Sequence, residues 1–141
     1  MPSPKCIFCA IAAQKAPAEI VAQDDAAVAF LDIRPAAPGH TLVIPCQHYA
    51  TIWELDDVAS LAVMRLTLRV AHALRAAFRP DGLSVMQNNG RAAGQEVLHV
   101  HWHLIPRWHG DGLRLVRGPA VSPDEPLPEV ARRIRAALPT A

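Results

Sequence analysis

Hydrophobic and polar positions alternate most clearly over residues 98–105. The apolar side chains there are Leu98, Val100, Trp102 and Leu104, and the polar side chains between them are His99, His101 and His103. Because successive side chains of a strand point to opposite faces, the pattern predicts a β-strand with one apolar face and a row of three imidazoles. We expect the apolar face to pack beneath a helix, and Pro106 to mark the end of the strand or an edge.

Shorter apolar runs predict the rest of a sheet. Further strands are expected at 20–22, 26–33, 40–46 and 83–87, and a turn between the first two makes them a hairpin. The strand at 40–46 ends in Cys46, which we expect to be an inert thiol of the core. Hairpin connections favour an antiparallel arrangement.

Apolar positions at steps of three and four predict the helices. A long helix is expected from a cap near residues 55–57 to about residue 78. Its predicted apolar stripe comprises Leu61, Met64, Leu68, Ala71, Leu74 and Phe78. Short helices are expected at 6–14, with Ile7, Phe8 and Ile11 on the apolar face, and at 127–138. The predicted fold class is therefore α+β, a five-stranded antiparallel sheet with one long helix and a short N-terminal helix.

Composition and charge limit the number of domains and the kinds of partner that we expect. The 141 residues, 51% of them hydrophobic, predict a single domain over 1–141, with its core at about 6–107 and a C-terminal extension at 108–141. The formal net charge of +1 provides no global field toward nucleic acid or a membrane, so neither is expected as a partner. No apolar run approaches the ~18 residues of a membrane helix, and no signal-type segment is seen, so we expect a cytoplasmic protein.

Imidazole is the side chain that titrates near neutral pH and also serves as base, nucleophile or ligand. The loop at 88–97 leads directly into the histidines, and its glycines and small residues allow backbone amides to approach an anion closely. Asn88 and Gln95 can add side-chain donors. A histidine beside a bound phosphate suggests nucleophilic attack at phosphorus through a phosphoramidate that water later cleaves.

The segment His99-Val100-His101-Trp102-His103-Leu104-Ile105 resembles the signature of the histidine triad (HIT) family. Three further blocks resemble the family in the same order, at 30–35, 38–45 and 93–97. This resemblance implies a nucleotide-binding α+β fold, usually a symmetric homodimer with a continuous sheet. It also implies hydrolysis or transfer at the α-phosphorus of a purine nucleoside 5′-phosphate derivative.

The resemblance also implies roles for individual residues. His101 would be the nucleophile, His103 would contact the α-phosphate or bridging oxygen, and His40 would orient the triad from behind. Asp32 would bind the ribose hydroxyls. The residues expected to hold the phosphate are Asn88, Gly94, Gln95, Glu96 and Val97, the last through its backbone amide. Glu96 stands where many relatives have Ser or Thr, which leaves the leaving-group preference open.

Cys6 and Cys9 form a C-x-x-C pair. Without a disulfide framework, such a pair indicates metal binding or redox chemistry, or simply two buried thiols. Some bacterial HIT proteins and related uridylyltransferases hold zinc with two cysteines, a histidine and the first triad histidine. The resemblance therefore implies a structural Zn²⁺ held by Cys6, Cys9, His48 and His99, which would fix His99 beside the nucleophile.

The sequence thus favours a nucleotide hydrolase that acts on nucleoside 5′-phosphoramidates or dinucleoside polyphosphates. Residues 93–95 and 106–107 look closer to the dinucleotide-cleaving branch of the family. A phosphorylase or nucleotidyltransferase would use the same residues, and a non-catalytic nucleotide sensor is a further alternative. A catalytic zinc held by the three triad histidines is disfavoured, because the outer two lie ~13–14 Å apart on a flat strand.

Overall fold

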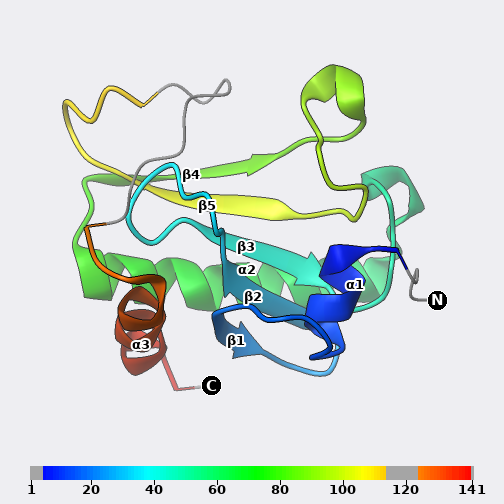
Figure 1. Cartoon of the computed structure of the whole chain (residues 1–141), viewed down its shortest axis with the longest axis horizontal. Helices are drawn as coiled ribbons and strands as arrows, with labels where there is room; N and C mark the ends of the chain where they lie inside the picture. The colour runs from blue at the N-terminus through cyan, green and yellow to red at the C-terminus, as the bar shows by residue number, and fades with distance from the viewer. Residues whose placement is uncertain (1–4, 114–123, 141) are drawn as a thin grey trace.

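A computed structural model describes residues 5–113 and 124–140, and in this part of the chain five antiparallel strands form one sheet in the order β1-β2-β3-β5-β4 (Figure 1). The strands are β1 (Ile20–Gln23), β2 (Ala27–Leu31), β3 (Thr41–Pro45), β4 (Gly82–Gln87) and β5 (Trp102–Arg107). The α-helices are α1 (Ile7–Ala12), α2 (Asp57–Phe78) and α3 (Leu127–Ala137), and the 3-10 turns are η1 (Ile52–Glu54) and η2 (Arg91–Ala93). The predicted α+β class and the hairpin of β1 and β2 are confirmed.

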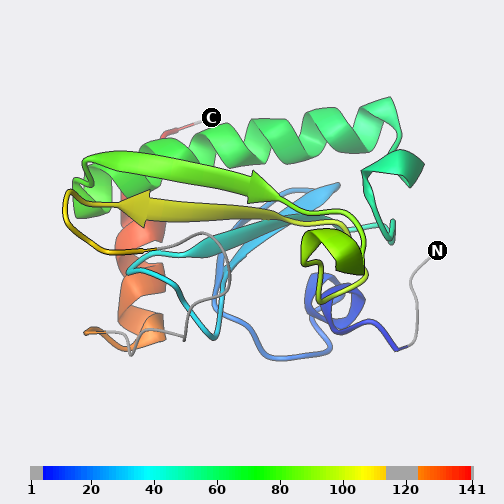
Figure 2. The same ribbon diagram turned by 90° about the horizontal axis from the view of Figure 1, so that it is seen from above.

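Helices α2 and α1 lie on opposite faces of the sheet (Figure 2). Strands β2 and β3 are buried throughout, so their side chains alternate between two apolar layers. The α2 layer receives Ala27, Ala29, Leu31, Val43 and Leu104, and the α1 layer receives Val28, Phe30, Leu42 and Ile44. Because Leu42 pairs directly with His103, the imidazole of His103 belongs to the α1 face.

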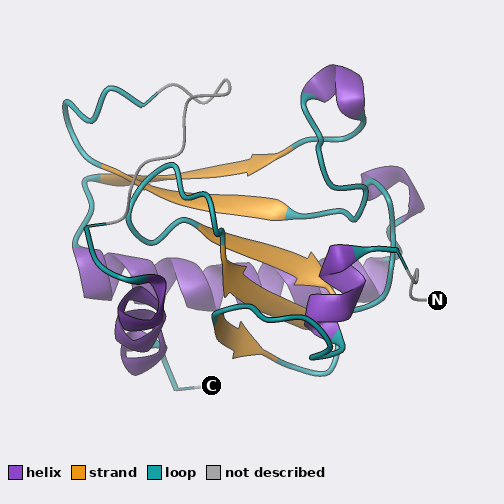
Figure 3. Cartoon of the chain, viewed as in Figure 1, coloured by secondary structure: helices purple, strands orange, loops and turns teal. Residues whose placement is uncertain are grey.

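Helix α2 begins where the sequence predicts, because the Asp56 carboxylate accepts a hydrogen bond from the Ala59 N–H at 2.8 Å. The predicted apolar stripe is wrong for Leu61, Met64 and Leu68, which are 65%, 48% and 55% exposed. The buried face consists instead of Ala59, Val63, Leu66, Thr67, Val70, Ala73 and Leu74. Helix α2 runs along the sheet (Figure 3), and of its two apolar stripes the one with mostly smaller and β-branched side chains packs against the strands, because such side chains allow close approach.

The predicted histidine strand is only partly formed. Strand β5 begins at Trp102 and ends one residue after Pro106, whereas residues 98–101 are irregular. The Val100 N–H bonds to the Tyr49 carbonyl at 2.7 Å rather than to a neighbouring strand. Leu98 is therefore exposed instead of packing beneath a helix, whereas His99 is fully buried on the α1 side, where its ring meets Phe8 as the ring of His101 does.

The two short helices also differ slightly from expectation. Helix α1 is shorter than predicted and buries Phe8, Cys9 and Ile11, while Ile7 is exposed. Helix α3 packs against α2 and β1, as the C-terminal helix of the predicted extension. Residues 114–123 of that extension lie outside the described residues. No helix in the described part of the chain combines the length and apolar character needed to cross a bilayer.

Candidate active site

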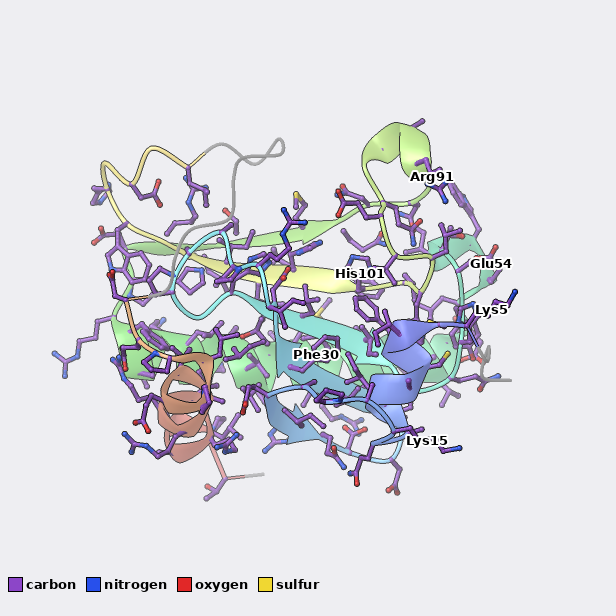
Figure 4. All side chains as sticks on the ribbon, in the orientation of Figure 1. Lys5, Lys15, Phe30, Glu54, Arg91 and His101 are labelled. Carbon is purple, nitrogen blue, oxygen red and sulfur yellow. The ribbon has the colours of Figure 1, made fainter. Side chains whose placement is uncertain are left out.

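His101 is buried directly before β5 on the face of the sheet that α1 covers, the same face as Phe30 (Figure 4). Its Nδ1–H donates a 2.7 Å hydrogen bond to the carbonyl of His99, because a carbonyl can only accept. The neutral ring therefore keeps its lone pair on Nε2. The ring of Phe8 meets the imidazole edge-to-face with centroids 5.2 Å apart, so the ring is fixed from the side as well.

A hydrogen bond from His40 to His103 lies beside His101, the candidate nucleophile. The Ala36 N–H donates to His40 Nδ1 at 2.9 Å, so the proton of a neutral His40 resides on Nε2. That Nε2 lies 2.9 Å from His103 Nδ1, to which it donates. His103 consequently carries its own proton on Nε2, where it can donate to a ligand. The carboxylate of Asp32 lies 3.6 Å from His40 Nε2 and completes the group.

Burial keeps these imidazoles neutral. It lowers the pKa of His40 to about 4, and proximity to His101 adds to the effect. The pKa of His103 also falls to about 4, through burial first and then through His101 and His40. Burial likewise lowers the pKa of His101, although Asp32 opposes the shift. Near pH 7 the site therefore presents uncharged rings, the form of imidazole that acts as a nucleophile.

The loop between β4 and the histidines is held by Gln95. Its buried side-chain oxygen accepts from the Gly90 N–H at 2.7 Å, and its NH₂ group donates to the carbonyls of Ala50 at 2.7 Å and Val97 at 3.0 Å. Both donors are thus used inside the protein, so Gln95 shapes the loop, and its predicted contact with phosphate stays a prediction.

The other predicted phosphate residues line the same loop. Gly90 and Gly94 have φ angles of +86° and +92°, which allow the tight turns around η2. A Cβ at Gly94 would stand 3.9 Å from Nδ2 of Asn88, so these two positions are neighbours. Glu96 is exposed and Val97 is half-buried against the α1 layer.

A second cluster joins α1 to the triad. Its donor atoms are the thiol sulfurs of Cys6 and Cys9 and the Nδ1 atoms of His48 and His99, all within 4.8 Å of one another. Cys6 Sγ lies 3.4 Å and Cys9 Sγ 3.5 Å from His99 Nδ1, and Cys9 Sγ lies 3.2 Å from His48 Nδ1. These separations approach the edge of about 3.5 Å that follows from tetrahedral zinc with bonds of about 2.3 and 2.0 Å.

The ring of His99 has the tautomer that such a site needs. Its Nε2–H donates to the Pro45 carbonyl at 2.8 Å, which leaves the Nδ1 lone pair facing the two sulfurs. The donor set therefore fits a closed zinc site. The same geometry argues against one open zinc shared by the triad, because both ring nitrogens of His99 are directed elsewhere, Nε2 at the Pro45 carbonyl and Nδ1 at the two sulfurs.

Sequence reasoning missed the Pro45 carbonyl as the acceptor that orients His99. It placed Phe8 on the apolar face of the N-terminal helix, and the structure sets that ring against His101. The alternation within β2 could have placed Phe30 on the same face as Asp32. The backbone groups of Pro45, Ala36 and His99 carry no side-chain signal. Cys46, expected in the core, is half-buried just after β3, and the remaining histidines, His72 and His109, are exposed.

Comparison with known proteins identifies the family. Residues 13–110 match the HIT domain. The chain belongs to the HIT family. This HIT protein is 41% identical over 130 residues to an uncharacterised HIT-like protein of Methanocaldococcus jannaschii, covering 92% of this chain and 98% of the other. It is 42% identical over 102 residues to the adenosine 5′-monophosphoramidase of Schizosaccharomyces pombe, covering 72% and 74% of the two chains.

A solved structure of a zinc-bound histidine triad family protein from Mycobacterium smegmatis has the same fold. It superposes with a TM-score of 0.84 at 36% identity and covers 94% of this chain and 92% of its own. The cluster formed by Cys6, Cys9, His48 and His99 is thus found in a family that includes a metal-bound member.

Proposed function

We propose that this HIT protein is a nucleotide hydrolase that acts at the α-phosphorus of nucleoside 5′-phosphoramidates or dinucleoside polyphosphates. The observation that carries the proposal is the 2.7 Å hydrogen bond from His101 Nδ1–H to the His99 carbonyl. It leaves the Nε2 lone pair of a neutral ring as the attacking pair. The named activity of the S. pombe relative, a phosphoramidase, supports the same class of reaction.

The reaction runs in two steps. His101 Nε2 attacks phosphorus, the bond to the leaving group breaks, and the departing atom takes its electron pair and a proton from solvent. The His103 Nε2–H hydrogen-bonds to the departing atom or a phosphate oxygen as negative charge develops there. The nucleotidyl-His101 ring is cationic, and its Nδ1–H remains on the His99 carbonyl. Water then attacks phosphorus and releases one proton to solvent, the N–P electron pair returns to Nε2, and the nucleoside monophosphate leaves.

The nucleotide is held by neighbouring residues on the same face. The Asp32 carboxylate accepts from the ribose hydroxyls, since one carboxylate can accept two donors. Ile33, which follows it, is 78% exposed and offers an apolar wall for a purine base together with Phe8. Asn88, the Gly94 backbone and the Val97 amide hold the phosphate.

We propose that Cys6, Cys9, His48 and His99 hold a structural Zn²⁺. The metal would supply a cross-link between α1 and the sheet and would require the cysteines as thiolates. The metal would fix the His99 ring at Nδ1, and the Pro45 carbonyl would fix it at Nε2. The His99 carbonyl would then be held in place to accept the hydrogen bond from His101. The cysteines are not disulfide-bonded, which agrees with the cytoplasmic setting that we propose.

A homodimer is the state that best covers the exposed apolar surface. Strand β4 is an edge strand, with Val85 exposed, and α2 exposes Val58, Leu61, Met64 and Leu68. An exposed apolar helix face and an unpaired strand edge are each an aggregation hazard unless a partner covers them. A second copy of this chain can cover both features by a two-fold arrangement that extends the sheet.

The test measures AMP release from adenosine 5′-phosphoramidate and from diadenosine tri- and tetraphosphate, with and without phosphate, for the wild type and His101→Ala. Release that disappears in the variant supports the nucleophile and identifies the substrate branch. ADP that forms only with phosphate would instead identify the phosphorylase alternative. AMP binding without turnover of any substrate would refute the hydrolase and leave the nucleotide sensor.

A further inference from the structure

Cys6 and Cys9 flank a residue that contacts the candidate nucleophile. Phe8 directly precedes Cys9 in the chain, and its ring meets the rings of His101 and His99 with centroids 5.2 and 6.0 Å apart. A change in the geometry of the two cysteines therefore acts on the backbone that carries this ring. The orientation of His101 depends in part on the turn from Cys6 to Cys9.

The sulfurs of the two cysteines are close enough to form a bond. The Cys9 N–H donates to Cys6 Sγ at 3.3 Å, both sulfurs face His99 Nδ1, and they lie within 4.8 Å of each other. A disulfide brings its two Cβ atoms to about 3.8 Å, whereas residues three apart on a helix have Cβ atoms about 5–6 Å apart. The bond is therefore within reach, but the first turn of α1 has to tighten by about 1–2 Å.

The two sulfurs differ in their access to solvent. Cys6 is half-buried, whereas Cys9 is 4% exposed and has its sulfur against His48. An oxidant from solvent reaches Cys6 first, and Cys9 lies beside it as a resolving thiol, the arrangement of redox-sensing cysteines. Cys46 packs against the same apolar layer but lies outside this cluster. In the cytoplasmic setting that we propose, a bridge between Cys6 and Cys9 forms only transiently, in response to an oxidant.

We propose that Cys6 and Cys9 are a reversible oxidation site, which hydrogen peroxide converts to a disulfide that displaces Phe8 and slows the reaction at His101. The effect on the reaction rests on the proposed function, whereas the oxidation itself does not. The Cys6 sulfur attacks one peroxide oxygen, the O–O bond breaks, and one water leaves the sulfenic acid behind. The Cys9 sulfur then attacks the Cys6 sulfur, the S–O bond breaks, and a second water leaves. Two thiols thus lose two electrons and two protons, which the peroxide gains.

The disulfide weakens the support of the reacting ring. Both sulfurs turn from His99 Nδ1 toward each other, and they no longer supply thiolates to the proposed Zn²⁺. The His99 carbonyl and the Phe8 ring, which hold His101, shift with them. Misplacing a reacting group by about 1 Å lowers rates by up to about hundredfold, so we expect kcat to fall by about tenfold to hundredfold.

The first experiment follows the disulfide. The protein is treated with hydrogen peroxide, and intact masses and peptide maps are measured before and after addition of dithiothreitol. We expect a bridge between Cys6 and Cys9 that dithiothreitol reverses. Cys46→Ser, a cysteine variant in the same layer, is the matched control and should form the bridge as the wild type does. Cys9→Ser should stop at the Cys6 sulfenic acid, which dimedone traps. Sulfinic acid at Cys6, or a bridge to Cys46, as the main wild-type product would overturn the proposal.

The second experiment follows the triad. NMR resonances of the His101 ring report its surroundings without any substrate, and kcat reports hydrolysis of adenosine 5′-phosphoramidate. On oxidation, the resonances should shift and kcat should fall, in the wild type and in Cys46→Ser, and dithiothreitol should restore both. A bridge that leaves the resonances and kcat unchanged would overturn the link to His101. If neither form hydrolyses the substrate, the proposed function fails, and the resonances alone decide whether the disulfide acts on the triad.

Discussion

Replacing Phe8 tests whether α1 positions the nucleophile. The Phe8 ring meets His101 at 5.2 Å, His99 at 6.0 Å and Phe30 at 5.3 Å between centroids, each near edge-to-face. Phe8→Leu keeps an apolar side chain but removes these three contacts, each worth about 0.5–1.5 kcal/mol. We therefore expect the free energy of unfolding to fall by about 2 kcal/mol, read from urea denaturation.

The kinetic effect should be separate from this loss of stability. Without the ring, the His101 imidazole can rotate away from the attack geometry, and small misplacements of a reacting group reduce rates by about tenfold to hundredfold. We expect kcat to fall by that amount at saturating adenosine 5′-phosphoramidate. Any loss of base contact appears in KM instead.

Ile11→Ala is the matched control. Ile11 is buried in the same helix and layer, and its removal costs about 2–4 kcal/mol, but it lacks an aromatic ring to set against the histidines. If the two variants lose similar stability and Phe8→Leu retains the wild-type kcat, Phe8 is only a core residue and the positioning argument is wrong.

Four further predictions follow from the same geometry. Chelation of zinc, or Cys9→Ser, should lower the melting temperature and release about one metal per chain, as measured by calorimetry and metal analysis; equal stability with and without metal would contradict the structural site. Because the pKa of His40 and His103 is about 4 in the folded protein against 6.5 for free imidazole, the unfolded state binds more protons between these values. Stability should be full above about pH 6.5 and should fall toward pH 4 by up to about 1.4 kcal/mol per pH unit for each histidine, and a flat urea midpoint between pH 7.5 and 5 would refute this. Leu68→Asp should convert the proposed dimer to a monomer in sedimentation, with Glu129→Gln as a control that leaves the wild-type state unchanged, and a wild type that sediments as a monomer would refute the dimer. Ile33→Ser should raise KM for the adenosine substrate with little change in kcat. A variant in which kcat falls and KM stays unchanged would show that Ile33 does not contact the base.

The sheet and the long helix could be predicted because their signals are local. Turn residues, β-branched runs and the Asp56 cap mark where β1–β4 and α2 begin and end. The buried face of α2 could not be predicted, because Leu61 and Leu66 are equally apolar and only the shape of the sheet distinguishes them. The spacing of apolar positions therefore identified the helix, but not which of its faces packs against the sheet.

Part of the candidate site could likewise be predicted from the sequence, and part could not. The grouping of His40 with His103, and of Cys6 and Cys9 with His48 and His99, matches what the resemblance implied. The regular histidine strand does not exist before Trp102, since Val100 bonds to Tyr49 and His99 turns into the interior. Backbone carbonyls decide which ring nitrogen carries each proton, and a sequence does not display them.

His99 makes three interactions. Its Nδ1 faces the sulfurs of Cys6 and Cys9, its Nε2–H donates to the Pro45 carbonyl, and its own carbonyl accepts a hydrogen bond from His101. If the proposed Zn²⁺ is bound there and His101 is the nucleophile, a sample in which only a fraction of the molecules carries zinc would contain two populations with differently ordered His101 rings. Specific activities from different preparations would be comparable only after the active fraction had been titrated alongside the metal content.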